Sequence, residues 1–122
     1  GVRIPFGTDA RNAPLQAAAL SAADSAQLAL ARTRERLGAA EQMARSGLRA
    51  AEAQHDASRT RAALLRERAG LVQRSFDAGE TPLPELLRVL SAAAQAEAAL
   101  ARRQAALGLA QARLQQALGI LP

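Results

Sequence analysis

The sequence predicts an all-α fold: a long antiparallel α-helical hairpin of the coiled-coil type, with one helix much longer than the other, plus a short β-strand stub at the N-terminus. The 122 residues are rich in Ala, Leu, Arg, Glu and Gln, a composition typical of long helices. Apolar residues recur at alternating spacings of three and four, as in coiled coils. Residues 74–90 contain the only real break in a chain that otherwise predicts helix almost throughout.

The first eight residues differ from the rest of the chain. Val2, Ile4 and Phe6 alternate with other residue types, which is the period of two expected of a β-strand. Pro5 restricts such a strand to an edge or a terminus. We expect residues 1–8 to be the stump of a strand or, alternatively, a disordered tail, followed by a polar linker.

The first helix is expected from about Pro14, which suits the first helical position, to Ala78. Such a helix is about 95 Å long. Before Leu37 no single apolar face is defined, a pattern expected of a helix that contacts more than one neighbour. A narrow heptad seam of mostly small side chains follows, made of Leu37, Ala44, Leu48, Ala51, His55, Ser58, Ala62, Leu65, Ala69, Val72 and Phe76.

The helical pattern stops and restarts within residues 79–82, which form the predicted turn. Gly79 is the natural left-handed stop of the first helix. Thr81 is the expected N-cap of the second helix, and Pro82 its first helical residue. Glu85 places a negative charge in the first turn, where the helix dipole favours it.

The second helix is expected over about 82–118, ending at Gly119. At about 55 Å it is little more than half as long as the first, so some 30 residues of the first helix need another neighbour. Arg103 is the one misfit on its seam, expected to pair with an acidic group across the hairpin or to point into a tunnel. The seam consists of Leu86, Val89, Ala93, Ala96, Leu100, Arg103, Leu107, Ala110, Leu114 and Ala117.

The net charge of +5 and a pI near 11.5 raise the question of nucleic-acid binding. The arginines are spread around the helices, and no aromatic residues stand between them to stack bases. We therefore predict a solvated face and no nucleic-acid partner. Several arginines have an acidic neighbour one turn away: Arg45 with Glu41, Arg59 with Asp56, and Arg88 with Glu85.

No set of residues suggests catalysis, a cofactor or a metal. The chain has no Cys, no glycine-rich phosphate loop and no nucleophile with a matching base, so we do not expect an enzyme. His55 is the only histidine, and Glu52 and Asp56 neighbour it on the same helix. One histidine with carboxylates is a poor zinc site, so a polar layer that fixes helix register is the favoured interpretation.

Three short motifs stand in order along the chain. Residues 1–7 contain an apolar-Pro-aromatic step, and residues 110–122 form an Ala- and Leu-rich helix closing on Ala-Leu-Gly. The turn carries Phe76-Asp77-Ala78-Gly79, then Leu83 and Glu85-Leu86-Leu87. At these separations the motifs resemble the C-terminal repeat of the TolC-like outer-membrane efflux proteins, over essentially the whole chain. The heavy-metal and cation-efflux branch is the most similar.

The resemblance implies a homotrimer with two repeats per protomer, whose helices form a tunnel through the periplasm of a Gram-negative bacterium. A periplasmic adaptor and an inner-membrane pump are the implied partners, and export of small solutes or metal cations is the implied function. Residues 1–8 would be the remnant of an outer-membrane barrel strand and residues 9–122 the periplasmic hairpin. The first repeat, most of the barrel and the signal sequence would lie outside this chain.

The resemblance also assigns an adaptor-binding tip, in which Gly79 lets the chain reverse and three leucines pack the tip. The family often has Tyr where this chain has Phe76, and some members have Arg where it has Thr81, so the family's polar gate does not carry over. The implied tip residues are Phe76, Asp77, Gly79, Glu80, Thr81, Leu83, Leu86 and Leu87.

Two other classes of function remain open from the residues alone. A coiled-coil hairpin can be the interaction module of a periplasmic adaptor or scaffold, with its tip as the docking site. In that case the hairpin would sit between the halves of a lipoyl-like β domain, whereas a barrel strand at the N-terminus would favour the channel. A basic helical nucleic-acid binder is the third possibility, and steep salt dependence of binding is its signature.

Overall fold

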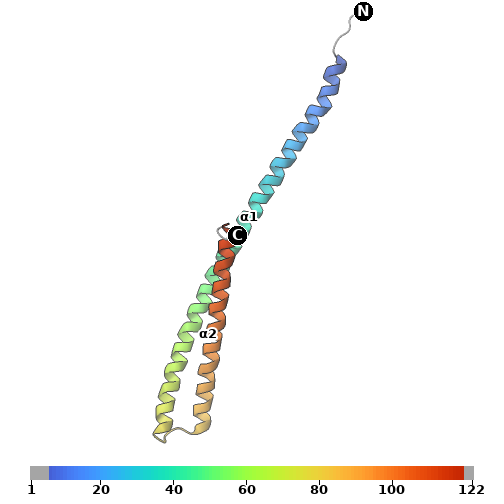
Figure 1. Cartoon of the computed structure of the whole chain (residues 1–122). Helices are drawn as coiled ribbons and strands as arrows, with labels where there is room; N and C mark the ends of the chain where they lie inside the picture. The colour runs from blue at the N-terminus through green and yellow to red at the C-terminus, as the bar shows by residue number, and fades with distance from the viewer. Residues whose placement is uncertain (1–5, 120–122) are drawn as a thin grey trace, which may run out of the picture. The chain divides into compact units, whose positions relative to one another are not determined.

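The computed structural model describes residues 6–119, with side chains from residue 12 onward. It contains two helices, α1 (Phe6–Asp77) and α2 (Leu83–Ala117), joined by a short turn, and no strand within the described residues. The chain divides into two units, Gly1–Ala40 and Glu41–Pro122. In the second unit α2 runs back along α1 from the turn (Figure 1), so the predicted antiparallel helical hairpin is confirmed.

The N-terminal unit departs from the expected strand and linker. Residues 1–5 of that expectation lie outside the described residues, but Phe6–Thr8 and the expected linker are part of α1. A lone strand leaves its backbone groups without partners, whereas a helix pairs them within the segment. Pro14, expected at the start, lies inside the helix. Its missing N–H removes one helical hydrogen bond without ending α1.

Every described side chain of the N-terminal unit, over residues 12–40, is exposed. Leu37 was expected to begin the seam but is 61% exposed. The length of α2 explains the difference. With 35 residues it can cover about as many residues of α1, counted back from the turn, which reaches only to about residue 43. The seam therefore begins at Ala44.

The core of the hairpin is a single line of small and medium side chains. From Ala44 to Phe76 every predicted seam position of α1 is buried or half-buried, and so is every one of α2 except Arg103. The heptad prediction is confirmed over this range. The buried side chains are Ala62 (1% exposed), Ala69 (7%), Leu86 (4%), Val89 (6%) and Ala96 (5%).

The far end of α2 closes as the sequence predicts. Gly119 has φ +75°, and its N–H donates to the carbonyl of Gln116 at 3.0 Å. The N–H of Leu118 donates to the carbonyl of Leu114 at 2.9 Å. These bonds satisfy carbonyl groups that have no partner within the helix.

Candidate docking site at the hairpin tip

The end of α1 is a complete Schellman motif. Gly79 adopts φ +75°, and its N–H donates to the carbonyl of Phe76 at 2.9 Å. The N–H of Glu80 donates to the carbonyl of Ser75, also at 2.9 Å. This pair of bonds, with a left-handed glycine between them, defines the motif. A β-carbon on Gly79 would meet no atom within 4 Å, so the position needs glycine for its backbone angle and not for space.

The N-cap of α2 lies one residue later than predicted. Pro82, with φ −71° and ψ 152°, is the N-cap, and α2 begins at Leu83. The carbonyl of Pro82 accepts the N–H groups of Glu85 at 3.2 Å and Leu86 at 3.3 Å. No side chain caps this helix, so the prediction of Thr81 as N-cap is wrong. Proline is suited to this place because its restricted φ fits the extended cap conformation.

Thr81 instead links the turn to the last turn of α1. Its hydroxyl oxygen lies 2.6 Å from the hydroxyl oxygen of Ser75, and both side chains are half-buried. Ser75 also accepts the Glu80 N–H through its carbonyl, so it holds the last turn of α1 to both middle residues of the connection. The sequence did not single out Ser75. Its role depends on the course of the chain beyond Gly79, and no motif or spacing marks it.

Of the three leucines of the predicted tip, one is buried and two are exposed. Leu86 is buried against α1, but Leu83 is 50% and Leu87 is 56% exposed. A helix turns by about 100° per residue, so a leucine adjacent to a seam position points away from the seam. Leu83, Leu87 and Leu90, spaced four and three apart, share one face of α2, and Leu90 is 40% exposed. We call these three residues the leucine stripe.

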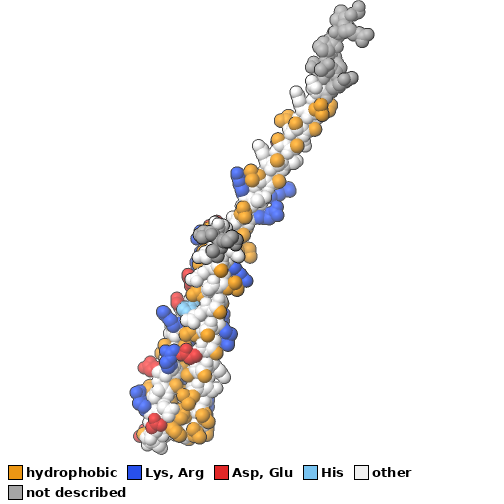
Figure 2. All heavy atoms as spheres, viewed as in Figure 1, with side chains coloured by type: hydrophobic (Ala, Val, Ile, Leu, Met, Phe, Trp, Pro, Cys, Tyr) orange, Lys and Arg blue, Asp and Glu red, His pale blue; other side chains and the backbone are white. Residues whose placement is uncertain are grey.

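Hydrophobic side chains gather over α2 near the turn in Figure 2, where the leucine stripe lies. Two acidic residues, Asp77 and Glu80, precede the leucine stripe in the chain. Glu80 is exposed in the turn, and within the described residues it takes part in no ion pair. Asp77 is also exposed and accepts a hydrogen bond from the Gln73 side chain at 3.0 Å. Phe76 is half-buried on the seam. The tip thus presents an exposed apolar stripe beside two carboxylates, which suits docking of another protein segment.

Among the described residues, two polar contacts link the helices away from the tip. Arg66 forms an ion pair and hydrogen bond with Glu97. Arg103 donates from Nη1 to Oε1 of Gln54 at 2.8 Å, so this seam misfit does reach across the hairpin, but to an amide and not to an acidic group, which was one of its two expected placements. Of the arginines expected to have acidic neighbours, Arg45 pairs with Glu41 at 2.8 Å.

His55 occupies the seam as expected, with its side chain 18% exposed and Nδ1 3.7 Å from Oδ1 of Asp56. The described residues contain no group of three or more His, Cys, Asp or Glu side chains placed to hold a metal ion. They also contain no helix that is long and apolar enough to cross a membrane. The exposed leucine stripe and the two carboxylates make the tip the candidate functional site on the hairpin.

Comparisons with known proteins add no relative. No protein-family model matches the chain, and no curated protein and no solved structure matches it significantly.

Proposed function

We propose that the chain is a wall segment of an efflux channel of the TolC-like type, exporting small solutes or metal cations as part of a tripartite pump. The observation that carries this proposal is a second heptad row on the outside of α2. It is spaced four and three, like the seam, but its members are exposed in the hairpin: Ala94, Ala98, Ala101, Ala105 and Gly108.

A helix with heptad rows on two faces is suited to packing between two neighbours. Small side chains on the second row allow a neighbouring helix to approach closely. The seam of α2 is occupied by α1, so the second row is available for a helix of another hairpin. Repetition of such contacts produces a wall of helices, as the proposed tunnel requires. In this proposal the exposed leucines of residues 12–40 are covered by further helices of the complete assembly.

The tip is proposed to receive a periplasmic adaptor. The leucine stripe supplies apolar area for the contact, and Asp77 and Glu80 supply charges that favour basic partner residues. The Schellman motif and the Ser75–Thr81 contact hold these groups in one arrangement. Leu86 is a core residue of the hairpin, and its side chain is too buried to contact the adaptor.

Site-specific cross-linking tests both parts of the proposal, because the chain has no cysteine of its own. Single cysteines are introduced into the full-length protein in cells, at Glu80 for the tip, at Ala101 for the second row and at Ala63 as an exposed control. We expect Glu80→Cys to cross-link to a periplasmic adaptor, Ala101→Cys to a second copy of the protein or to its first repeat, and Ala63→Cys to neither.

The two positions separate the competing functions. An adaptor cross-link at Glu80 with none at Ala101 indicates a free-standing interaction module and contradicts the channel wall. Cross-links at Ala101 with none at Glu80 retain the wall and remove the adaptor from the tip. Equal labelling of all three positions with no cross-link in a folded protein contradicts both parts.

A further inference from the structure

One side of the hairpin carries two rows of arginines. On α1, Arg61 and Arg68 stand seven residues apart, and on α2, Arg88 and Arg102 stand fourteen apart. Residues separated by whole heptads lie on the same side of a coiled-coil helix. All four side chains are exposed. We call these four residues the arginine face.

The structure brings the two rows to the same side of the seam. Arg68 of α1 and Arg88 of α2 line one shallow depression together with the seam residue Leu65 and with Ala92. A neighbouring depression shares Leu65 and Ala92 and is lined by Arg61. Arg61, Arg68 and Arg88 therefore border one continuous surface that runs over the junction between the two helices. Arg102 follows Arg88 by two heptads on the same side of α2.

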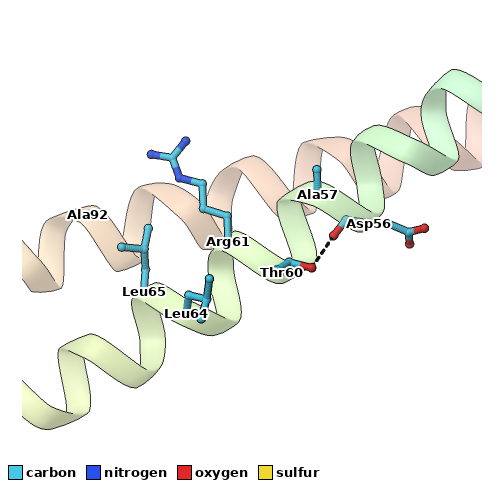
Figure 3. A pocket seen from close by; sticks show the side chains of 7 residues that line it. All are labelled: Asp56, Ala57, Thr60, Arg61, Leu64, Leu65 and Ala92. Carbon is cyan, nitrogen blue, oxygen red and sulfur yellow. Dashed lines mark hydrogen bonds between the residues drawn. The ribbon is translucent and has the colours of Figure 1, made fainter.

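The surface between the arginines is apolar. Figure 3 shows Arg61 beside Ala57, Leu64 and Leu65 of α1, with Ala92 on the facing helix. Leu64 is 61% exposed. The rim opposite Arg61 is polar, where the Thr60 hydroxyl donates to the Asp56 carbonyl at 3.1 Å. The groove thus combines an apolar floor with cationic edges.

The positive charge of this face is not balanced by ion pairs. Within the described residues, the arginines in ion pairs are Arg45 and Arg66, both outside the arginine face. Two carboxylates lie near the groove. Asp56 stands at its rim beside His55, and Glu85 stands seven residues before Ala92, towards the tip. Neither is within ion-pair distance of the four arginines.

We propose that the arginine face binds an amphipathic helix of a partner protein, with an apolar stripe flanked by Glu or Asp. Apolar side chains of that helix would cover Leu64 and its neighbours, while its carboxylates would pair with the arginines. Arg61 and Arg68 are about 10.5 Å apart along the axis, the repeat of a heptad in the partner. Arginine suits this role because its guanidinium can bind a carboxylate through two parallel hydrogen bonds.

The apolar floor favours a protein helix over a nucleic acid. Phosphate groups would use the arginines but leave Leu64 and the alanines uncovered, and no aromatic side chain in the groove offers stacking for a base. The inference concerns a surface separate from the tip. It rests on the hairpin alone and does not depend on the proposed channel.

Fluorescence anisotropy with the complete 122-residue chain tests the proposal. The probe is a labelled synthetic helix of about four heptads, with Leu at positions a and d and Glu at e and g. Mutual repulsion of the Glu residues opposes its self-association at neutral pH. A matched peptide carries Lys at every Glu position. We expect the Glu peptide to bind and the Lys peptide not to bind.

Two double variants with the same change of charge locate the site. Arg68→Gln with Arg88→Gln removes two arginines of the arginine face, and Arg49→Gln with Arg59→Gln removes two exposed arginines elsewhere on α1. We expect the first pair to weaken binding about tenfold or more and the second by less than about threefold, because only the first removes direct pairing with carboxylates. Circular dichroism checks that both variants keep the helicity of the parent.

Three results would overturn the proposal. One is equal weakening by the two double variants, which indicates attraction by net charge alone. Another is the absence of Glu-peptide binding at low salt. The third is tighter binding of a short DNA duplex than of the Glu peptide, with a steep dependence on salt, which assigns the arginines to nucleic acid.

Discussion

Gly79 is the residue on which the reversal of the chain depends, because its φ of +75° disfavours any side chain. We predict that Gly79→Ala destabilises the hairpin by about 1–2 kcal/mol. Gly70→Ala is the matched control, since Gly70 lies inside α1 and an added β-carbon there meets nothing within 4 Å. It should stabilise by up to about 1 kcal/mol. Urea unfolding followed by circular dichroism measures both, and shifts of the same sign would contradict this account.

Ser75 and Thr81 form the second determinant of the turn. Their hydroxyl groups lie 2.6 Å apart in a half-buried site. We predict that Ser75→Ala and Thr81→Val each destabilise the hairpin by about 1 kcal/mol, since each leaves the other hydroxyl without its partner. The double variant should lose less than the sum of the two single losses. Strict additivity in a double-mutant cycle would mean that this contact contributes nothing to stability.

The turn shows which residue-level features a sequence can predict. The left-handed stop at Gly79 was predictable because only glycine adopts that angle readily. The cap of α2 was not, because Thr81 and Pro82 both have side chains suited to the start of a helix. The choice between them depends on the direction in which the chain leaves Gly79. The hydroxyl of Thr81 is hydrogen-bonded to that of Ser75 and does not cap α2, and Pro82 is the N-cap residue.

At the scale of the element, the seam decides which leucines contribute to stability. Leu86 is 4% exposed and Leu87 is 56% exposed, although the two are adjacent. We predict that Leu86→Ala destabilises the hairpin by about 2 kcal/mol or more, because it leaves a cavity between the helices. Leu87→Ala should change stability by less than about 0.5 kcal/mol. Thermal unfolding of the two variants compares them directly, and equal losses would place Leu87 in the core as well.

The helices themselves were largely predictable, and the exceptions have physical causes. The spacing of three and four from Ala44 onward predicted the buried positions because helical period and packing agree there. The start of α1 was not predictable from Pro14, because proline favours the first turn of a helix and is costly in its interior, yet α1 extends upstream of it. The exposure of Leu37 depends on the length of α2, which is a property of the partner helix and not of the residue.

For the whole molecule, the hairpin is expected to fold without the N-terminal unit. The described side chains over residues 12–40 are all exposed, so that segment buries nothing that stabilises the hairpin. We predict that a chain of residues 41–122 keeps the unfolding free energy of the complete chain to within about 0.5 kcal/mol. Urea unfolding of the two chains measures this difference. A substantial loss would show that α1 upstream of Glu41 stabilises the hairpin through continuity of the helix.

The five buried side chains are not spread evenly along the hairpin. All of them, from Ala62 to Ala96, lie in the half nearest the turn. The seam positions over residues 44–58 and 107–117 are only half-buried, and Arg103 is exposed. Amide hydrogens in the far half should therefore exchange with deuterated water sooner than those near the turn. Separation of the helices then begins at their far ends and proceeds towards Gly79. A partner that inserts between the helices would enter from that end. The turn keeps α1 and α2 joined, so that they can pair again in the same register.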